Sequence, residues 1–160
     1  MSEESLRNEK RMQAYKNAIL GGEAIYELIP QRPPMVMVDT LIDSDEKTTL
    51  TAFTIKNDNL FVRGGIFRES GIIENMAQSG AVRAGYTSIK EKRSIPIGFI
   101  GGLKNLSIKK LPKVNDILFT EVNTVYELSD FILIYSRVEN KGEIIADCEM
   151  KVFLQRDEMP

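Results

Sequence analysis

Residues 69–89 read ESGIIENMAQSGAVRAGYTSI and carry the longest helical pattern in the chain. Small residues recur in this stretch at three- and four-residue steps, which places them on one side of the predicted helix. They are Ala77, Gly80, Ala81, Ala84 and Gly85. Small side chains let a curved sheet come close to the helix axis. We therefore expect a long helix that is buried against a sheet.

The segments on both sides of this helix have strand patterns. Before it, residues 35–42 and 48–55 flank a turn at 43–46, which predicts a hairpin. After it, strand patterns occupy residues 95–109, 117–125, 131–138 and 143–154. The pair Gly101 and Gly102 predicts a bulge in the first of these, and Gly142 a tight turn before the last. Strands grouped around one helix indicate an α+β fold with an antiparallel sheet, not alternating βαβ units.

The length of the chain sets the domain organisation that we expect. Its 160 residues are enough for one domain, since domains average roughly 100 to 200 residues. Residues 3–19 have a helical pattern that ends at the glycine pair 21–22. We predict an N-terminal helical extension over residues 1–24 and a single domain over residues 25–160.

Composition excludes several classes of function. The net charge of −2 provides no general basic field for nucleic-acid binding. No apolar run approaches the ~18 residues that a membrane span requires, and the first residues are acidic where a secretory signal would be basic. We therefore predict a cytoplasmic protein that neither binds nucleic acid nor spans a membrane.

The residues that the chain lacks limit its chemistry. It has no histidine and one cysteine, Cys148. An intramolecular disulfide and a cysteine-rich metal site are thereby excluded, and the commonest acid/base group is missing. We expect no metal and no cofactor, and we expect Cys148 to be a small buried residue, not a nucleophile.

Positive charge is concentrated in the middle of the chain. Residues 83–113 contain eight basic residues and one acidic residue, whereas the whole chain is slightly acidic. Such a segment either attracts an acidic partner or is simply a solvated surface, and both interpretations fit the sequence.

Two motifs resemble a known family. Residues 28–39, LIPQRPPMVMVD, are similar to the opening LPHRPPMLLVD of the β-hydroxyacyl-[acyl carrier protein] dehydratases. Residues 74–80, ENMAQSG, are similar to the EAMAQAAG motif of their central helix, and residues 111–116, LPKVND, to their PVVPGD turn. The resemblance covers residues 25–155. It implies the hotdog fold, in which an antiparallel sheet wraps a long helix and two chains pair around an acyl tunnel.

The chain also departs from that family. The family's catalytic histidine lies in a GHFPG loop before the helix, where this chain reads FVRGGIFRESG over residues 61–71. Gln31 stands where the opening motif usually has histidine. In the family the histidine removes the proton beside the thioester carbonyl while the helix carboxylate helps the 3-hydroxyl to leave. The pattern is also similar to a dehydratase-like subset from aryl-polyene pathways, which lacks that loop.

The resemblance and the helix position nominate candidate site residues. Glu74 is the predicted catalytic carboxylate, although a solvent-facing glutamate or a salt bridge to Arg32 or Arg68 would fit the sequence equally well. Gln78, one turn later, would orient Glu74 or satisfy buried backbone groups.

Four further residues are predicted to bind substrate through the backbone. If Ser70 caps the helix, Glu74 lies near its first turn, and the amides around Ser70 and Gly71 would polarise a thioester carbonyl. Gly64 and Gly65 would let substrate pass close to the main chain, or would only form a turn.

The resulting functional hypothesis has three versions. The first is a dehydratase-like protein that binds 3-hydroxyacyl or enoyl thioesters of an acyl carrier protein, or acyl-CoA, in fatty-acid or polyene biosynthesis. Its chemistry would be weakened, or supplied by a partner. The second is an acyl thioesterase that uses Glu74 to activate water, and the third is a non-catalytic subunit of a mixed dimer. A homodimer and a heterodimer with a histidine-bearing hotdog paralogue both remain open.

Overall fold

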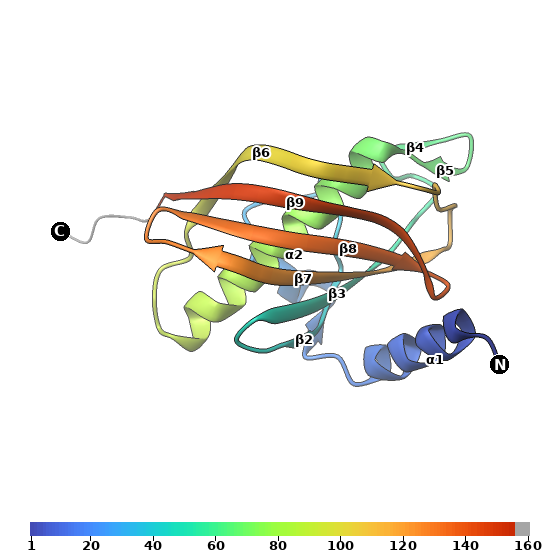
Figure 1. The fold of residues 1–160 in the computed structure, drawn as a ribbon, viewed down its shortest axis with the longest axis horizontal. Coiled ribbons are helices and arrows are strands. Elements are labelled where there is room, and N and C mark those ends of the chain that lie inside the picture. Colours follow the sequence, from blue (N-terminus) through green and yellow to red (C-terminus); the bar gives the residue numbers. More distant parts are fainter. Residues whose placement is uncertain (156–160) are drawn as a thin grey trace.

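The computed structural model describes residues 1–155 as one curved sheet wrapped around a helix, with a second helix outside (Figure 1). The sheet has seven strands in the order β1-β2-β3-β7-β8-β9-β6, all antiparallel. The elements, in chain order, are α1 (Glu3–Lys16), β1 (Leu20–Gly21), the 3-10 helix η1 (Gly22–Glu27), β2 (Thr40–Ser44), β3 (Thr48–Thr54), β4 (Val62–Arg63), β5 (Ile66–Phe67), α2 (Glu69–Lys90), β6 (Ile97–Ile108), β7 (Ile117–Glu127), β8 (Phe131–Asn140) and β9 (Glu143–Gln155). This arrangement confirms the predicted α+β class and the long central helix.

The main core lies between α2 and the inner face of the sheet. Ile72 and Met76 of α2 are fully buried there, against Leu118, Val122 and Val138 of the sheet. Because successive strand residues point to opposite faces, these strands place every second side chain against the helix. The longest helix is therefore held by apolar burial along its inward side.

The first predicted strand begins later than expected. We expected it over residues 35–42, but β2 begins at Thr40. The preceding backbone bonds to α2 instead of a strand: the Met37 amide donates to Gln78 Oε1 at 2.6 Å, and Asn75 Nδ2 donates to the Met37 carbonyl at 2.7 Å. Side-chain amides of the helix thus replace the ladder bonds that the apolar pattern suggested.

The other strand features match the sequence pattern. The register of β6 with β9 shifts between Ile100 and Gly102, which confirms the predicted bulge. A Cβ on Gly101 would lie 2.3 Å from the Phe153 ring, so the ring requires glycine at that position. Lys141 and Gly142 have positive φ in the tight turn between β8 and β9.

Helix α1 packs on the outer face of the sheet. Leu50 and Ala52 of β3 contact it, whereas Thr51 between them bonds to Ser79 of α2. Arg11 of α1 donates to Glu139 and Glu121 at 2.9 Å each. The predicted helical extension therefore lies against the sheet, and β1, within the same predicted segment, pairs with β2. The boundary at residue 24 stays a prediction.

Within residues 1–155, no helix has both the length and the apolar composition needed to cross a membrane.

Candidate functional site

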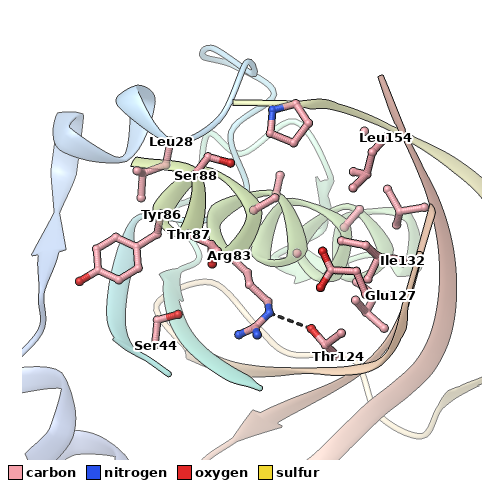
Figure 2. A pocket seen from close by; sticks show the side chains of 18 of the residues that line it. Leu28, Ser44, Arg83, Tyr86, Thr87, Ser88, Thr124, Glu127, Ile132 and Leu154 are labelled. Carbon is pink, nitrogen blue, oxygen red and sulfur yellow. Dashed lines mark hydrogen bonds between the residues drawn. The ribbon is translucent and has the colours of Figure 1, made fainter. Parts of the chain in front are cut away.

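A cavity of about 740 Å³ lies between α2 and the sheet (Figure 2). Its helix side is lined by small residues, namely Ala77, Gly80, Ala81 and Ala84. Its sheet side is lined by larger apolar residues, which include Ile132, Ile134, Val152 and Leu154. The cavity thus has an apolar part along one side of the helix, and polar residues that include Asp45, Arg83 and Glu127 line the rest of it.

The small residues of α2 have a role besides the one predicted for them. We expected them to bring the sheet close to the helix axis, but four of the five line the cavity and make room in it. Close approach holds at Gly80, where a Cβ would lie 2.8 Å from Ile134 Cδ1. The fifth, Gly85, contacts the loop instead, because a Cβ there would lie 2.1 Å from the Leu28 carbonyl oxygen.

Glu74 lies in the wall of this cavity, toward the N-terminal end of the lined part of α2. Its Oε1 accepts a hydrogen bond from Gln78 Nε2 at 2.9 Å. Neither of its predicted alternative partners bonds to it. Arg68 pairs with Glu69, and Arg32 donates to the carbonyls of Ile29 and Gln31.

Gln78 is fully buried and performs both tasks predicted for it. It bonds to Glu74, and it also satisfies the backbone of the loop before β2. Its Nε2 donates to the Met35 carbonyl at 2.7 Å, and its Oε1 accepts from the Met37 amide. One side chain therefore fixes the position of the carboxylate relative to the opening motif.

The start of α2 differs from the prediction. Arg68, not Ser70, is the N-cap residue, and the helix begins at Glu69. Glu74 therefore lies in the second turn, away from the positive end of the helix dipole. The expectation that Glu74 lies near the first turn depended on Ser70 as the N-cap. It was wrong, because the extended backbone ends at Arg68 and the helix therefore begins two residues earlier.

Ser70 and Gly71 lie outside the cavity lining. Ser70 is exposed, whereas Gly71 is buried and its amide donates to the Arg68 carbonyl at 3.0 Å. A Cβ on Gly71 would lie 2.3 Å from the Phe67 ring, so glycine is required there for packing. The proposed contact of these amides with a thioester stays a prediction.

Gly64 and Gly65 form the turn between β4 and β5. Their φ values are 57° and 76°, which favour glycine, and a Cβ would meet nothing within 4 Å. The Gly65 carbonyl accepts from the Val114 amide at 3.0 Å. Both residues lie outside the cavity lining, and their predicted contact with substrate also stays a prediction.

Arg83 is a cavity residue that sequence reasoning did not assign to the site. Figure 2 shows it reaching from α2 toward Thr124 on β7, to which its Nε donates at 2.9 Å. Its other nitrogens bond to Thr49 Oγ1 and to the carbonyls of Asp45 and Glu46. Burial lowers the pKa of Arg83, against the opposing effect of nearby carboxylates. In the sequence, Arg83 is the one charged residue among the small residues over 77–85, and this was the signal that could have identified it.

The basic segment does not form one face. Arg83 is bound inside the fold, whereas Lys90 and Lys92 lie at the C-terminal end of α2. Lys109 and Lys113 lie beyond the far end of β6, which spans twelve residues and so roughly 40 Å. Lys113 lies beside β5, through a bridge with Ile66. Apart from Lys104 within β6, the exposed positive charge of this segment is therefore divided between the two ends of that strand.

Two further groups with raised pKa values lie within the fold. Cys148 is buried, as predicted, and burial raises the pKa of its thiol. Burial also raises the pKa of Asp39, the last residue of the opening motif. The Asp39 carboxylate accepts from the Thr54 amide at 2.8 Å and from Thr40 Oγ1 at 2.7 Å, and so joins the start of β2 to the end of β3.

Comparison with known proteins identifies the fold and the family. Residues 23–159 match the sequence profile of the ApeP-like family, described as ApeP dehydratase. No curated protein matches the chain in sequence.

Several solved structures share this fold. The dehydratase heterocomplex ApeI:P from Xenorhabdus doucetiae superposes with a TM-score of 0.79 at 17% identity, over 86% of this chain and 93% of that one. A hypothetical thioesterase with coenzyme A from Streptococcus pneumoniae gives 0.59 at 12% identity, over 74% and 87%. The PaaI protein from the phenylacetic acid degradation operon of E. coli gives 0.61 at 12% identity, over 96% and 99%. These similarities confirm the hotdog fold.

Proposed function

The chain belongs to the ApeP-like dehydratase family, and from this membership we propose that it is one half of a two-chain dehydratase. Its substrate would be a 3-hydroxyacyl thioester of an acyl carrier protein in fatty-acid or polyene biosynthesis, in the cytoplasm. The other half would be a hotdog chain that carries the catalytic histidine.

The observation that carries the proposal is the setting of Glu74. Its carboxylate lies in the wall of the cavity and is held at 2.9 Å by a buried glutamine that is itself fixed to backbone. The apolar part of the wall, which includes Ala77, Ile134 and Val152, suits the acyl chain of a ligand whose polar reacting end lies at the carboxylate. The thioester end of an acyl chain would lie at Glu74, with the chain extending along α2.

Dehydration requires two proton transfers, and Glu74 can perform one of them. In its protonated form it would give a proton to the 3-hydroxyl oxygen as the carbon–oxygen bond breaks and water leaves. A base must take the proton from C2, so that its electron pair forms the C2–C3 double bond. This chain has no histidine for that step. The second hotdog chain would supply the base, and solvent would return the proton to Glu74.

The edge strand β6 supports a second chain. It lies at one edge of the sheet, and ten of its twelve residues are exposed. Large apolar side chains are among them, and Phe99 is 55% exposed. Ile100 and Gly98 of the same strand also line the cavity. A partner strand added here would pair the open edge and cover that side of the cavity. The ApeI:P heterocomplex is a dehydratase built from two chains, which favours a mixed pair over a homodimer.

A thioesterase is the second candidate. The same carboxylate could activate water against a thioester without histidine, and a hypothetical thioesterase of this fold has been solved with coenzyme A. The two functions differ in product, because hydrolysis releases a free thiol and dehydration forms a conjugated enoyl thioester.

The test is to assay the chain alone and with a histidine-bearing hotdog protein from the same cell. We expect light scattering to detect a mixed complex. Enoyl formation from a 3-hydroxyacyl carrier protein should require both chains, and Glu74→Gln should abolish it. An 18.1 kDa monomer in the presence of the partner would contradict the mixed pair. Release of a free thiol by the chain alone would mean that the protein is a thioesterase and not a dehydratase.

A further inference from the structure

Gln31 presents a buried amide oxygen that lacks a hydrogen-bond partner within residues 1–155. The residue lines the same cavity as Glu74, although it belongs to the opening motif and not to the helix. A buried acceptor without a donor is rare in folded proteins, because its lost hydration is not replaced. Because this oxygen is covered in the free protein although its residue lines the cavity, a donor carried by a ligand would reach it when the Gln31 side chain turns toward the cavity.

The backbone that carries Gln31 is fixed from both sides. Its carbonyl accepts from Arg32 Nη1 at 2.8 Å, and the same nitrogen donates to the Ile29 carbonyl at 2.9 Å. The Arg32 guanidinium in turn lies 5.3 Å from the centre of the Tyr26 ring. On the other side, Gln78 holds the Met35 carbonyl. The backbone of Gln31 therefore has a defined position beside the cavity, and its side chain extends from there.

The same glutamine, Gln78, also bonds to Glu74. The loop that bears Gln31 and the carboxylate are thus positioned by one buried side chain. An acyl thioester in the cavity would carry two kinds of donor close to its reacting carbons: the 3-hydroxyl group and the nearest amide N–H of the pantetheine arm. Either one would satisfy an amide oxygen.

We propose that Gln31 is a substrate-positioning residue, whose Oε1 accepts a hydrogen bond from a donor that the thioester ligand carries beside its reacting centre. This inference rests on the proposed function, since it requires an acyl thioester in the cavity. The ligand would then have a polar contact with Gln31 besides the one with Glu74. Gln31 would thereby have a function at the position where the family motif usually has histidine.

The test uses the full chain in complex with its histidine-bearing hotdog partner, and three unreactive probes in a binding titration. The first is a 3-hydroxyacyl pantetheine ketone, in which a methylene replaces sulfur. The second is the same ketone without the hydroxyl group, and the third is the acyl methyl ketone without the pantetheine arm. The variant Gln31→Met keeps the length of the side chain and removes the acceptor. Gln13→Met, on an exposed face of α1, is the matched control.

We expect Gln31→Met to bind the hydroxylated probe about three- to tenfold more weakly than wild type, the effect of one hydrogen bond. A loss confined to that probe would identify the 3-hydroxyl as the donor. An equal loss for both pantetheine probes, absent with the methyl ketone, would identify the pantetheine amide.

A second measurement separates this role from a structural one. Because Gln31 Oε1 has no partner in the free protein, Gln31→Met should leave the thermal midpoint of the free protein unchanged or raise it. A lowered midpoint, or wild-type affinity for all three probes, would overturn the inference and leave the proposed function standing. If wild type bound none of the probes, the proposed function would fail and the role of Gln31 with it.

Discussion

Gln78 donates to Glu74 across one turn of α2, at 2.9 Å between Nε2 and Oε1. The same amide bonds to backbone on both sides of Val36, through the Met35 carbonyl and the Met37 amide. These partners require nitrogen and oxygen in one orientation, so the amide cannot flip without losing its bonds. The position of the carboxylate is therefore coupled to the path of the opening motif.

Glu74→Gln should remove catalysis and leave the fold intact. Glutamine keeps an oxygen that can accept from Gln78, but it cannot transfer a proton. Loss of a general acid typically costs ~10² to 10⁴ in rate, so we expect the two-chain enzyme to lose at least about 100-fold in kcat. Enoyl formation and thermal unfolding measure the two effects. Glu69→Gln, in the exposed first turn, is the control; retained turnover in Glu74→Gln would remove Glu74 from the mechanism.

Ala84→Leu should shorten the acyl chain that the protein accepts. Ala84 lines the cavity and lies ten residues after Glu74, which is about 15 Å along the helix axis. A leucine there would occupy space that the end of a long chain needs, and each excluded methylene costs about 0.8 kcal/mol. In titrations with a series of acyl pantetheines, affinity for the longest chains should fall roughly tenfold and affinity for the shortest should not change. Ala84→Ser is the size-matched control, and a uniform loss would place the chain elsewhere.

Charge reversal at Lys109 and Lys113 should slow the docking of an acidic carrier protein. Glu74 lies at the N-terminal end of the cavity lining, and we propose that the carrier's arm enters from that end because the thioester is placed there. Lys113 lies near this end, beside β5, which directly precedes α2. Long-range attraction mainly affects association and is screened by salt, so kon should be several-fold below the wild-type value at low salt and close to it at high salt. Reversal at Lys90 and Lys92 is the control for the opposite end. If reversal at Lys90 and Lys92 slowed docking more, the carrier's arm would enter from the opposite end of the cavity.

Arg11→Ala should destabilise the protein by about 2 kcal/mol at neutral pH. The change leaves Glu139, whose side chain is 1% exposed, with only Arg137 at 3.6 Å, and the loss of one partner of a buried pair is costly. Urea denaturation measures the effect, and Lys10→Ala, exposed on the same helix, is the control. A stability equal to wild type would mean that α1 contributes no ionic stabilisation.

The second ion pair of Arg11, with Glu121, gives a pH dependence. Burial alone would raise the pKa of Glu121, but hydrogen bonds from Arg11 and Asn123 bring it below its ordinary value of 4.5. A carboxylate with a lowered pKa in the folded state stabilises the protein above its unfolded pKa, and this contribution is lost as the pH falls through the folded pKa. The stability difference between wild type and Arg11→Ala should therefore narrow below pH 4.5.

Much of the fold could be predicted from the sequence because periodicity reports burial. The helix expected over residues 69–89 is α2, and the later strand patterns correspond to β6 through β9. The start of β2 was missed because Met35 to Val38 are apolar enough for a strand, while their backbone bonds go to side chains far along the chain. Such bonds leave no local pattern.

The site was predictable only where a motif carried it. Glu74 and Gln78 came from the helix motif, and the cavity brings them together. Gly64 and Gly65 were selected for backbone freedom, which a turn also requires, and Gly71 was selected for its amide, although close packing against Phe67 also requires glycine there. Arg83 was missed because its partners, Thr49 and Thr124, are brought to it only by the folded sheet.

The two edges of the sheet are unequal, and this limits assembly. One edge is β1, which has two residues, and the other is β6, which has twelve. A strand pair of two residues is too short to hold another chain, so extension of the sheet can occur through β6 alone. Once a second chain has paired with β6, the sheet has no other edge strand long enough to pair with a third chain. Edge-to-edge growth therefore ends at a closed pair, and the exposed apolar strand does not propagate into a filament.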